Sequence, residues 1–326
     1  MIDAVWSSWA DEMAQSRGIT AEALNSMLDN LELNFPTDYL EKGLVDELVT
    51  REQLQQNLCN LFVVENFKDI KAIQLAEYAK LKNVPNLKAD KKVAVIYAEG
   101  NIVDGNGNED VAGDRFAKVI ADVREDDDVK AVVLRVNSPG GSALAADIVW
   151  REVKLLQEKK PVIVSMGDYA ASGGYYISCA ADYIVANPTT LTGSIGIFGM
   201  FPNMEKLLTE KLSLHFDVVK TNQFADMGNM TRSFNDAEKA AMQNYINNGY
   251  KLFVQRCAEG RGMSVEAIQK IAEGRVWTGS MAKELGLVDE LGGLDKALEI
   301  AAQKAGVENY SVLNYPEMDN VLSTLL

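Results

Sequence analysis

The sequence is poor in the side chains that bind metals and cross-link chains. Its 326 residues include one histidine and three cysteines, which are Cys59, Cys179 and Cys257. The cysteines are odd in number, far apart and outside any C-x-x-C pattern, so we expect buried thiols and no zinc cluster. We expect neither a metal nor a cofactor.

Positive charge is also scarce. The chain has 32 Lys and Arg residues against 47 Asp and Glu residues, a formal net charge of −15. Because nucleic-acid-binding surfaces need a basic footprint, nucleic acid is not an expected partner.

The sequence shows no secretory signal and no membrane-spanning run. The residues after Met1 lack the basic and apolar regions of a signal peptide. The longest uncharged stretch, 183–204, contains Pro188, Pro202 and three glycines, which exclude a membrane helix. We expect the chain as given to be soluble.

Two stretches of the chain occur twice. Residues 14–24 (AQSRGITAEAL) match 258–268 (AEGRGMSVEAI), and 42–48 (KGLVDEL) match 285–291 (LGLVDEL). A single one-residue gap aligns both blocks. The second copy ends a unit that begins near Lys92, whereas the first copy has no such unit before it. We therefore expect residues 1–60 to be the helical tail of an incomplete first repeat.

From Lys92 the pattern changes to short apolar runs that alternate with helical segments. Such alternation predicts parallel βαβ units with right-handed crossovers. We expect a connecting segment over 61–91 with a helix over 66–82, an α/β domain over 92–304 and a C-terminal extension over 305–326. The runs that predict buried strands are 93–97, 131–136, 161–165 and 183–186.

The clearest helix spans residues 235–257. Asn235 can cap it, and Glu238 follows three residues later, as in a capping box. We expect its apolar stripe to be core or subunit interface. The stripe consists of Met242, Tyr245, Ile246, Gly249, Leu252 and Phe253.

Two glycine-rich turns each follow an expected strand and precede a helical segment. They are Asn-Ser-Pro-Gly-Gly at 137–141 and Tyr-Ala-Ala-Ser-Gly-Gly at 169–174. A helix N-terminus presents unpaired N–H groups, and glycine allows a close backbone approach. Turns on neighbouring parallel strands can therefore offer two N–H donors to one oxyanion, with Ser172 as nucleophile. The pattern predicts a serine hydrolase.

The single histidine is a poor candidate for the base that such a serine needs. His215 lies between Leu214 and Phe216 in a segment with the pattern of a strand, so we interpret it as structural. Ala170 stands where a G-x-S-x-G elbow requires its first glycine, which argues against an α/β-hydrolase. A lysine whose pKa is lowered by burial is the remaining base.

These motifs resemble the signal peptide peptidase A family, also called protease IV. The resemblance rests on 137–141, 170–178 and 186–196, in this order and spacing, and is closest to the long, tandem-repeat bacterial form. It covers about 92–304 and the tail at 1–60. It implies an α/β fold, a crotonase/ClpP-like superhelix of ββα units. It also implies a serine endopeptidase that degrades remnant signal peptides with a Ser-Lys dyad.

The resemblance assigns roles to five residues of this chain. Ser172 matches the nucleophile, and Ser194 matches the serine that orients the base lysine. The N–H groups of Gly173 and of Gly140 or Gly141 match the oxyanion hole.

The sequence departs from the pattern of the family at the base lysine. Ala225 stands at the lysine position of single-repeat members, and Lys220 is in a different register. In tandem-repeat members the first repeat supplies the lysine and the second supplies the serine. We therefore expect the base lysine to lie outside this chain, and the chain alone to be weak or inactive.

The resemblance implies further properties of the full-length protein. They are cleaved signal peptides as substrates, an upstream membrane anchor, and a bacterial envelope location, periplasmic or on the outer face of the inner membrane. A dome-like homo-oligomeric ring, such as a tetramer, is also implied.

Two alternative functions stay open. One is a crotonase-type acyl-CoA enzyme, which shares the two-turn oxyanion hole but normally uses carboxylates. The other is a catalytically inactive assembly module.

Overall fold

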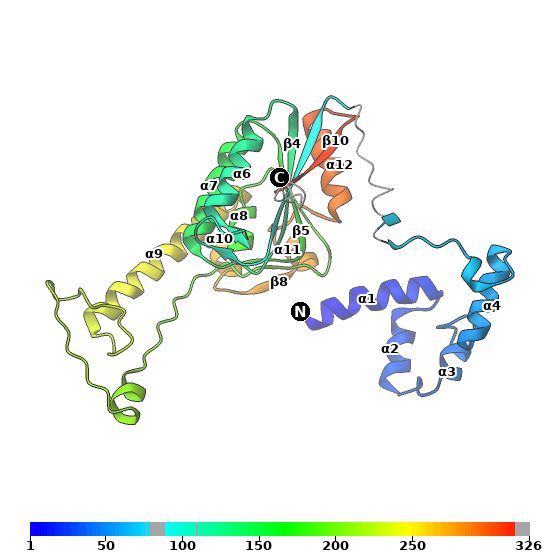
Figure 1. The fold of residues 1–326 in the computed structure, drawn as a ribbon, viewed down its shortest axis with the longest axis horizontal. Coiled ribbons are helices and arrows are strands. Elements are labelled where there is room, and N and C mark those ends of the chain that lie inside the picture. The colour runs from blue at the N-terminus through cyan, green and yellow to red at the C-terminus, as the bar shows by residue number, and fades with distance from the viewer. Residues whose placement is uncertain (76, 79–88, 109, 317–326) are drawn as a thin grey trace. The chain divides into compact units, whose positions relative to one another are not determined.

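The structure is a computed structural model that describes residues 1–75, 77–78, 89–108 and 110–316. The chain forms two compact units, Met1–Lys88 and Ala89–Leu326 (Figure 1). The helices of the first unit are α1 Ile2–Arg17, α2 Ala21–Asp29, α3 Pro36–Glu41, α4 Arg51–Phe62 and the 3₁₀ helix η1 Phe67–Asp69.

The second unit alternates strands and helices. Its strands are β1 Lys92–Glu99, β2 Ile102–Val103, β3 Val111–Ala112, β4 Val129–Ser138, β5 Val162–Ala171, β6 Tyr183–Ala186, β7 Leu191–Gly193, β8 Val276–Thr278, β9 Glu290–Leu291 and β10 Ser311–Tyr315. Its helices are α6 Gly113–Glu125, α7 Ala143–Gln157, α8 Gly173–Ser178, the π-helix η2 Leu207–Lys211, α9 Asp236–Arg261, α10 Val265–Ile271, α11 Gly279–Glu284 and α12 Leu294–Ala305.

A parallel sheet organises the second unit. Its strand order is β10-β1-β4-β5-β6-β9, with β7 parallel to β5 and β8 antiparallel to β7. Figure 1 shows α6 and α7 on one side of the sheet and α12 on the other. Because both faces are covered, the strands are nearly continuous apolar runs. The α/β class expected from the sequence is confirmed.

Each central strand contributes to two apolar layers. In β1, Ala94 and Ile96 belong to the core shared with α6, α7, α8 and α9, whereas Val93 and Val95 belong to the core shared with α12. The two glycine turns follow β4 and β5 at the carboxyl edge of the sheet, where open α/β sheets commonly bind ligands.

One local expectation holds only in part and another is wrong. Of the helix expected over 66–82, residues 67–69, 75 and 77–78 are helical, 70–74 are not, and 76 and 79–82 lie outside the described residues. Ile73 is exposed, so it lacks the packing that stabilises most short helices. The strand expected around His215 is also absent, because that segment is exposed and pairs with no strand among the described residues. None of the described helices is both long enough and apolar enough to cross a bilayer.

The two sequence repeats adopt the same local structure. α1 ends at Gly18 (φ 66°) and α9 ends at Gly262 (φ 62°), both left-handed C-caps. The hydroxyl groups of Thr20 and Ser264 then cap the following helices, α2 and α10. An arginine–aspartate pair recurs in both copies.

The two ion pairs differ in burial. Arg17 contacts Asp46 at 3.1 Å, with side chains 34% and 89% exposed. Arg261 contacts Asp289 at 2.6 Å, with side chains 7% and 28% exposed. Asp289 also accepts a 2.7 Å hydrogen bond from the N–H of Ile184 in β6. The second pair therefore fastens the end of α9 to the sheet.

We predict that Arg261→Met destabilises the second unit far more than Arg17→Met destabilises the first. Removing Arg261 leaves the Asp289 carboxylate, 28% exposed, without its cation, at a cost that approaches but stays below the roughly 3–5 kcal/mol of a fully buried pair. An exposed pair contributes about 0–1 kcal/mol. Denaturant unfolding and amide hydrogen exchange measure both effects, and equal losses for the two variants would contradict this account.

Candidate active site

Ser172 has a strained backbone. It joins β5 to α8 with φ 52° and ψ −118°, a positive-φ conformation that costs a non-glycine residue about 1–3 kcal/mol. Its N–H donates to the carbonyl of Gly193 at 2.9 Å, and its carbonyl accepts from the N–H of Tyr176 at 2.9 Å. No hydrogen bond joins its hydroxyl group to another described residue. The strain thus places a free hydroxyl at a sharp strand-to-helix turn.

The two glycine turns are in direct contact. A Cβ atom on Gly140 would lie 2.6 Å from the nitrogen of Gly173 and 2.9 Å from the Cβ of Ser172. Gly140 also has a φ of 98°, which disfavours any larger residue. The structure therefore brings Gly140, Gly141, Ser172 and Gly173 together, as the sequence predicts.

The hydrogen bonds distinguish the two glycines of the first turn. The N–H of Gly140 donates to the hydroxyl of Ser138 at 3.1 Å. Within the described part of the chain, the N–H groups of Gly141 and Gly173 have no acceptor. A Cβ on Gly173 would lie 3.3 Å from the nitrogen of Gly141, so the two groups are neighbours. Gly141 and Gly173 can thus donate to one oxyanion, while Gly140 permits their approach.

A short strand that the sequence did not reveal fixes Gly141. In β2 the N–H of Ile102 donates to the carbonyl of Gly140 at 2.9 Å, and its carbonyl accepts from Ser142 at 2.8 Å. The hydroxyl of Ser142 donates to Asp104. A Cβ on Gly141 would lie 2.0 Å from the carbonyl oxygen of Ile102, so this position has no room for a side chain.

Ser172, Gly141 and Gly173 line one cavity of about 590 Å³. Its opposite wall is the apolar stripe of α9, which the sequence placed in the core or at an interface. The spacing of that stripe is visible in the sequence, but the element it faces is not. The α9 residues in this wall include Tyr245, Ile246, Gly249, Leu252 and Phe253.

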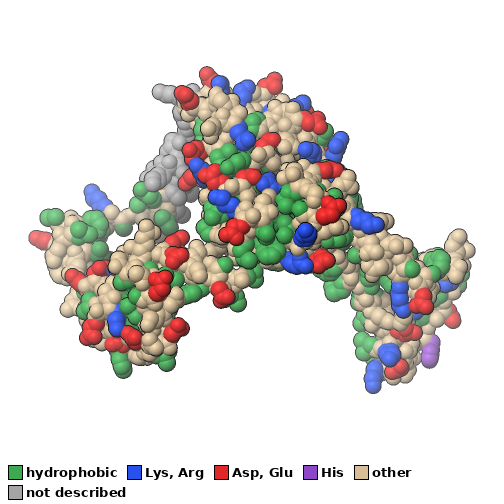
Figure 2. All heavy atoms as spheres, turned by 180° about the vertical axis from the view of Figure 1, so that it is seen from behind, with side chains coloured by type: hydrophobic (Ala, Val, Ile, Leu, Met, Phe, Trp, Pro, Cys, Tyr) green, Lys and Arg blue, Asp and Glu red, His purple; other side chains and the backbone are tan. Residues whose placement is uncertain are grey.

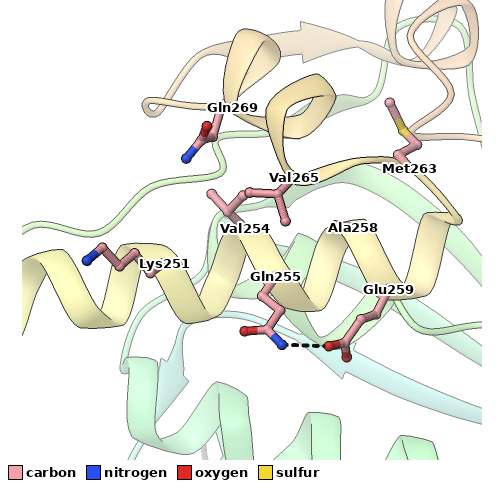
Figure 3. Close-up of a pocket in the computed structure, with 8 residues that line it drawn as sticks. All are labelled: Lys251, Val254, Gln255, Ala258, Glu259, Met263, Val265 and Gln269. Atoms are coloured by element: carbon pink, nitrogen blue, oxygen red, sulfur yellow. Dashed lines mark hydrogen bonds between the residues drawn. The ribbon is translucent and has the colours of Figure 1, made fainter.

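A second hollow lies between α9 and α10 (Figure 3). It has a volume of about 450 Å³ and includes Val254, Ala258 and Val265. Its polar pair, Gln255 and Glu259, is joined by a 2.8 Å hydrogen bond. Since none of the residues that line it is a nucleophile next to unpaired N–H groups, the cavity at Ser172 is the candidate active site.

Ser194 lies beside the nucleophile position in the sheet register. Ala171 of β5 pairs with Gly193 of β7, so Ser172 and Ser194 are the next residues along the two strands. Ser194 also has a left-handed φ of 49°, and its N–H donates to the carbonyl of Arg275 at 2.7 Å. It is not among the residues that line the cavity.

The candidate bases named from the sequence lie elsewhere. His215 is exposed (Figure 2, purple). Lys220 forms a 3.0 Å ion pair with Asp226. Ala225 is exposed in a turn. No lysine or histidine is found among the described residues that line the cavity.

Arg232 links two carboxylates next to the N-terminus of α9. It contacts Asp226 at 2.7 Å and Glu238 at 2.6 Å, and the Glu238 side chain is fully buried. Hydrogen bonds from Arg232, and then from the N–H of Asn235, lower the pKa of Glu238 to about 2. Hydrogen bonds from Arg232 and Lys220 likewise hold the pKa of Asp226 well below its usual range. This network fastens the segment before α9 to the helix.

We predict that Gly141→Ala lowers the free energy of unfolding by on the order of 3 kcal/mol, since the new Cβ must displace the Ile102 carbonyl and accept a left-handed φ. Gly107→Ala is the control, because a Cβ there has no atom within 4 Å. Denaturant unfolding compares the two. Equal stability of both variants would contradict the prediction, because it would show that a Cβ at position 141 fits without displacing the Ile102 carbonyl.

We also predict a pH-dependent loss of stability through Glu238. Its folded pKa is depressed, so it stabilises the fold fully above about pH 4.5 and loses this effect as the pH falls toward 2. Glu238→Gln should lower Tm at pH 7, and its difference from the wild type should shrink between pH 5 and pH 3. The control is Asp236→Asn on the same helix, whose side chain is fully exposed. A difference that does not change with pH would contradict this role.

The sequence is similar to known peptidases. Peptidase family S49 matches residues 154–308. Protease 4 of Haemophilus influenzae is 39% identical over 351 residues, which cover 99% of this chain and 55% of that protein. A putative protease of Synechocystis is 36% identical over 218 residues, which cover 67% of this chain and 76% of that protein. The chain thus spans about half the length of the relatives named Protease 4.

A ClpP1 mutant from Listeria monocytogenes is a similar solved structure, with a TM-score of 0.44 and 18% identity over 63% of this chain and 94% of that one. The family match and the parallel α/β core agree with the fold class expected from the sequence. The identity and coverage of the relatives also confirm the resemblance stated there. The chain belongs to peptidase family S49.

Proposed function

We propose that the protein is a serine endopeptidase in which Ser172 is the nucleophile. The observation that carries this proposal is the strained Ser172, whose free hydroxyl lines a cavity beside the unpaired N–H groups of Gly141 and Gly173. An unpaired hydroxyl next to two neighbouring N–H donors suits acyl transfer, in which a nucleophile attacks and an oxyanion forms.

The proposed chemistry proceeds in two steps. The Ser172 oxygen attacks the carbonyl carbon of a peptide bond while a base takes the hydroxyl proton. The carbonyl oxygen becomes an oxyanion that accepts hydrogen bonds from Gly141 and Gly173. The base then gives its proton to the leaving amine, and water later releases the acyl group from Ser172.

We propose a lysine as the base, supplied by the first repeat, of which residues 1–60 would be the tail. The matched turns, caps and ion pairs of the two copies support this assignment, as does the greater length of the Protease 4 relatives. Ser194 would orient the lysine amine, since it is next to Ser172 in the strand register. The ion pair of Lys220 and the exposure of His215 argue against a base from the described residues.

We propose cleaved signal peptides as substrates. The apolar wall of α9 suits an apolar peptide segment. An envelope location and a membrane anchor in the full-length protein go with this substrate.

We also propose a ring of subunits, because the segment before α9 exposes large apolar side chains that a neighbouring subunit can cover. They include Phe198, Met200, Leu212 and Val219.

The test is amine rescue of ester hydrolysis. Without a base, the oxyanion hole alone leaves roughly 10³–10⁴-fold catalysis over water. We predict slow hydrolysis of a peptide ester with an apolar residue before the cleaved bond. Ethylamine should raise this rate about tenfold, since a soluble amine can take the proton of Ser172. Ser172→Ala should show neither the slow reaction nor the rescue.

Two results would contradict the proposal in different ways. Fast hydrolysis that depends on Ser172 and needs no amine would place a base within this chain. Equal rates for the wild type and Ser172→Ala, with and without amine, would remove Ser172 as the nucleophile.

A further inference from the structure

The cavity at Ser172 contains one carboxylate among the residues that line it. This is Asp147 of α7, and its side chain is 41% exposed. Leu252 and Phe253 of α9 line the same cavity. A few polar groups in an apolar pocket fix the orientation and identity of a ligand, so this carboxylate needs an explanation.

A tyrosine holds the carboxylate in place. The hydroxyl of Tyr176 donates to Oδ1 of Asp147 at 2.7 Å. Burial, and then this hydrogen bond, raise the pKa of Tyr176, so the phenol keeps its proton and remains a donor. Tyr176 is one turn of α8 after Ser172 and donates its N–H to the Ser172 carbonyl at 2.9 Å. The carboxylate is thereby positioned relative to the nucleophile.

The carboxylate retains capacity for another partner. Among the described residues, Arg256 forms an ion pair with Oδ1 of Asp147, at 3.9 Å, which is beyond hydrogen-bond distance. Its guanidinium lies over the ring of Trp150 at 3.6 Å. No described residue donates a hydrogen bond to Oδ2 of Asp147. An ionised carboxylate offers about four acceptor sites, and this one accepts a single hydrogen bond from the described residues, that of Tyr176.

The position of Asp147 favours a substrate residue with a long side chain. It is five residues after Ser142 and so about 7.5 Å along the helix axis from the glycine turn. Helical side chains tilt toward the N-terminus, and the glycine turn lies at that end of α7. A lysine or arginine side chain can place its apolar stem against Leu252 and Phe253 and its charge at Asp147.

We propose that Asp147 is a specificity residue that binds the cationic end of a basic side chain in the peptide substrate. The inference rests on the proposed function, because it takes the cavity beside Ser172 as the substrate site. A basic residue is thereby selected next to the reacting bond, in addition to the apolar residues that the α9 wall accepts.

The test is the binding of two labelled peptides, Ala-Ala-Ala-Lys and Ala-Ala-Ala-norleucine, which differ by one charge. Fluorescence anisotropy should show the lysine peptide binding about fivefold more tightly, the size expected for a partly exposed ion pair. In Asp147→Asn the ratio of the two affinities should fall to about one. The preference should also weaken as salt is raised.

Two controls separate a specific site from the general attraction of an acidic protein. Asp122→Asn removes a similar charge from an exposed position of α6 and should keep the fivefold ratio. Ala-Lys-Ala-norleucine carries the same charge at another position and should bind no more tightly than Ala-Ala-Ala-norleucine. An equal ratio in the wild type and Asp147→Asn, or no binding of either peptide, overturns the proposal.

The result is independent of the amine-rescue experiment. Rescued hydrolysis that depends on Ser172, without any lysine preference, would leave the peptidase proposal standing and remove the cation site. A lysine preference without such hydrolysis would leave the cation site standing and remove Ser172 as the nucleophile.

Discussion

The candidate site depends on the contact between two backbone turns. Gly140 must lack a Cβ for its turn to touch Gly173, and Gly141 must lack one to fit under the Ile102 carbonyl. This contact places two N–H groups side by side without any side chain. The parallel pairing of β4 with β5 holds the turns together and offsets the roughly 1–3 kcal/mol of strain at Ser172.

The parts of the site that the sequence predicted are local. β5, its glycine turn and α8 follow one another between Val162 and Ser178, so Ser172 could be singled out from local residue types and spacing. Which of Gly140 and Gly141 has an N–H group free to donate could not be predicted in this way. It depends on the Ser138 hydroxyl and on Ile102, whose contacts form only when three strand ends meet.

The parts that the sequence missed depend on distant partners. The stripe on α9 has helical spacing whether it faces a core, a subunit or a cavity, and only the packing of α9 beside Ser172 decides. The strand expected at His215 and the middle of the helix expected over 66–82 are absent for the opposite reason. Their apolar spacing is present, but the described residues give these segments no surface to cover.

The order of the sheet has a consequence for synthesis of the protein. β1 lies between β4 and β10, and Lys92 of β1 pairs with Ser311 of β10. At about 5–20 residues per second, the ribosome needs on the order of 10–40 s to travel from one strand to the other. During that time the β10 side of β1 is an edge of unpaired backbone N–H and C=O groups, next to the apolar side chains of Val93 and Val95. Cellular yield should therefore depend on chaperones that shield nascent chains.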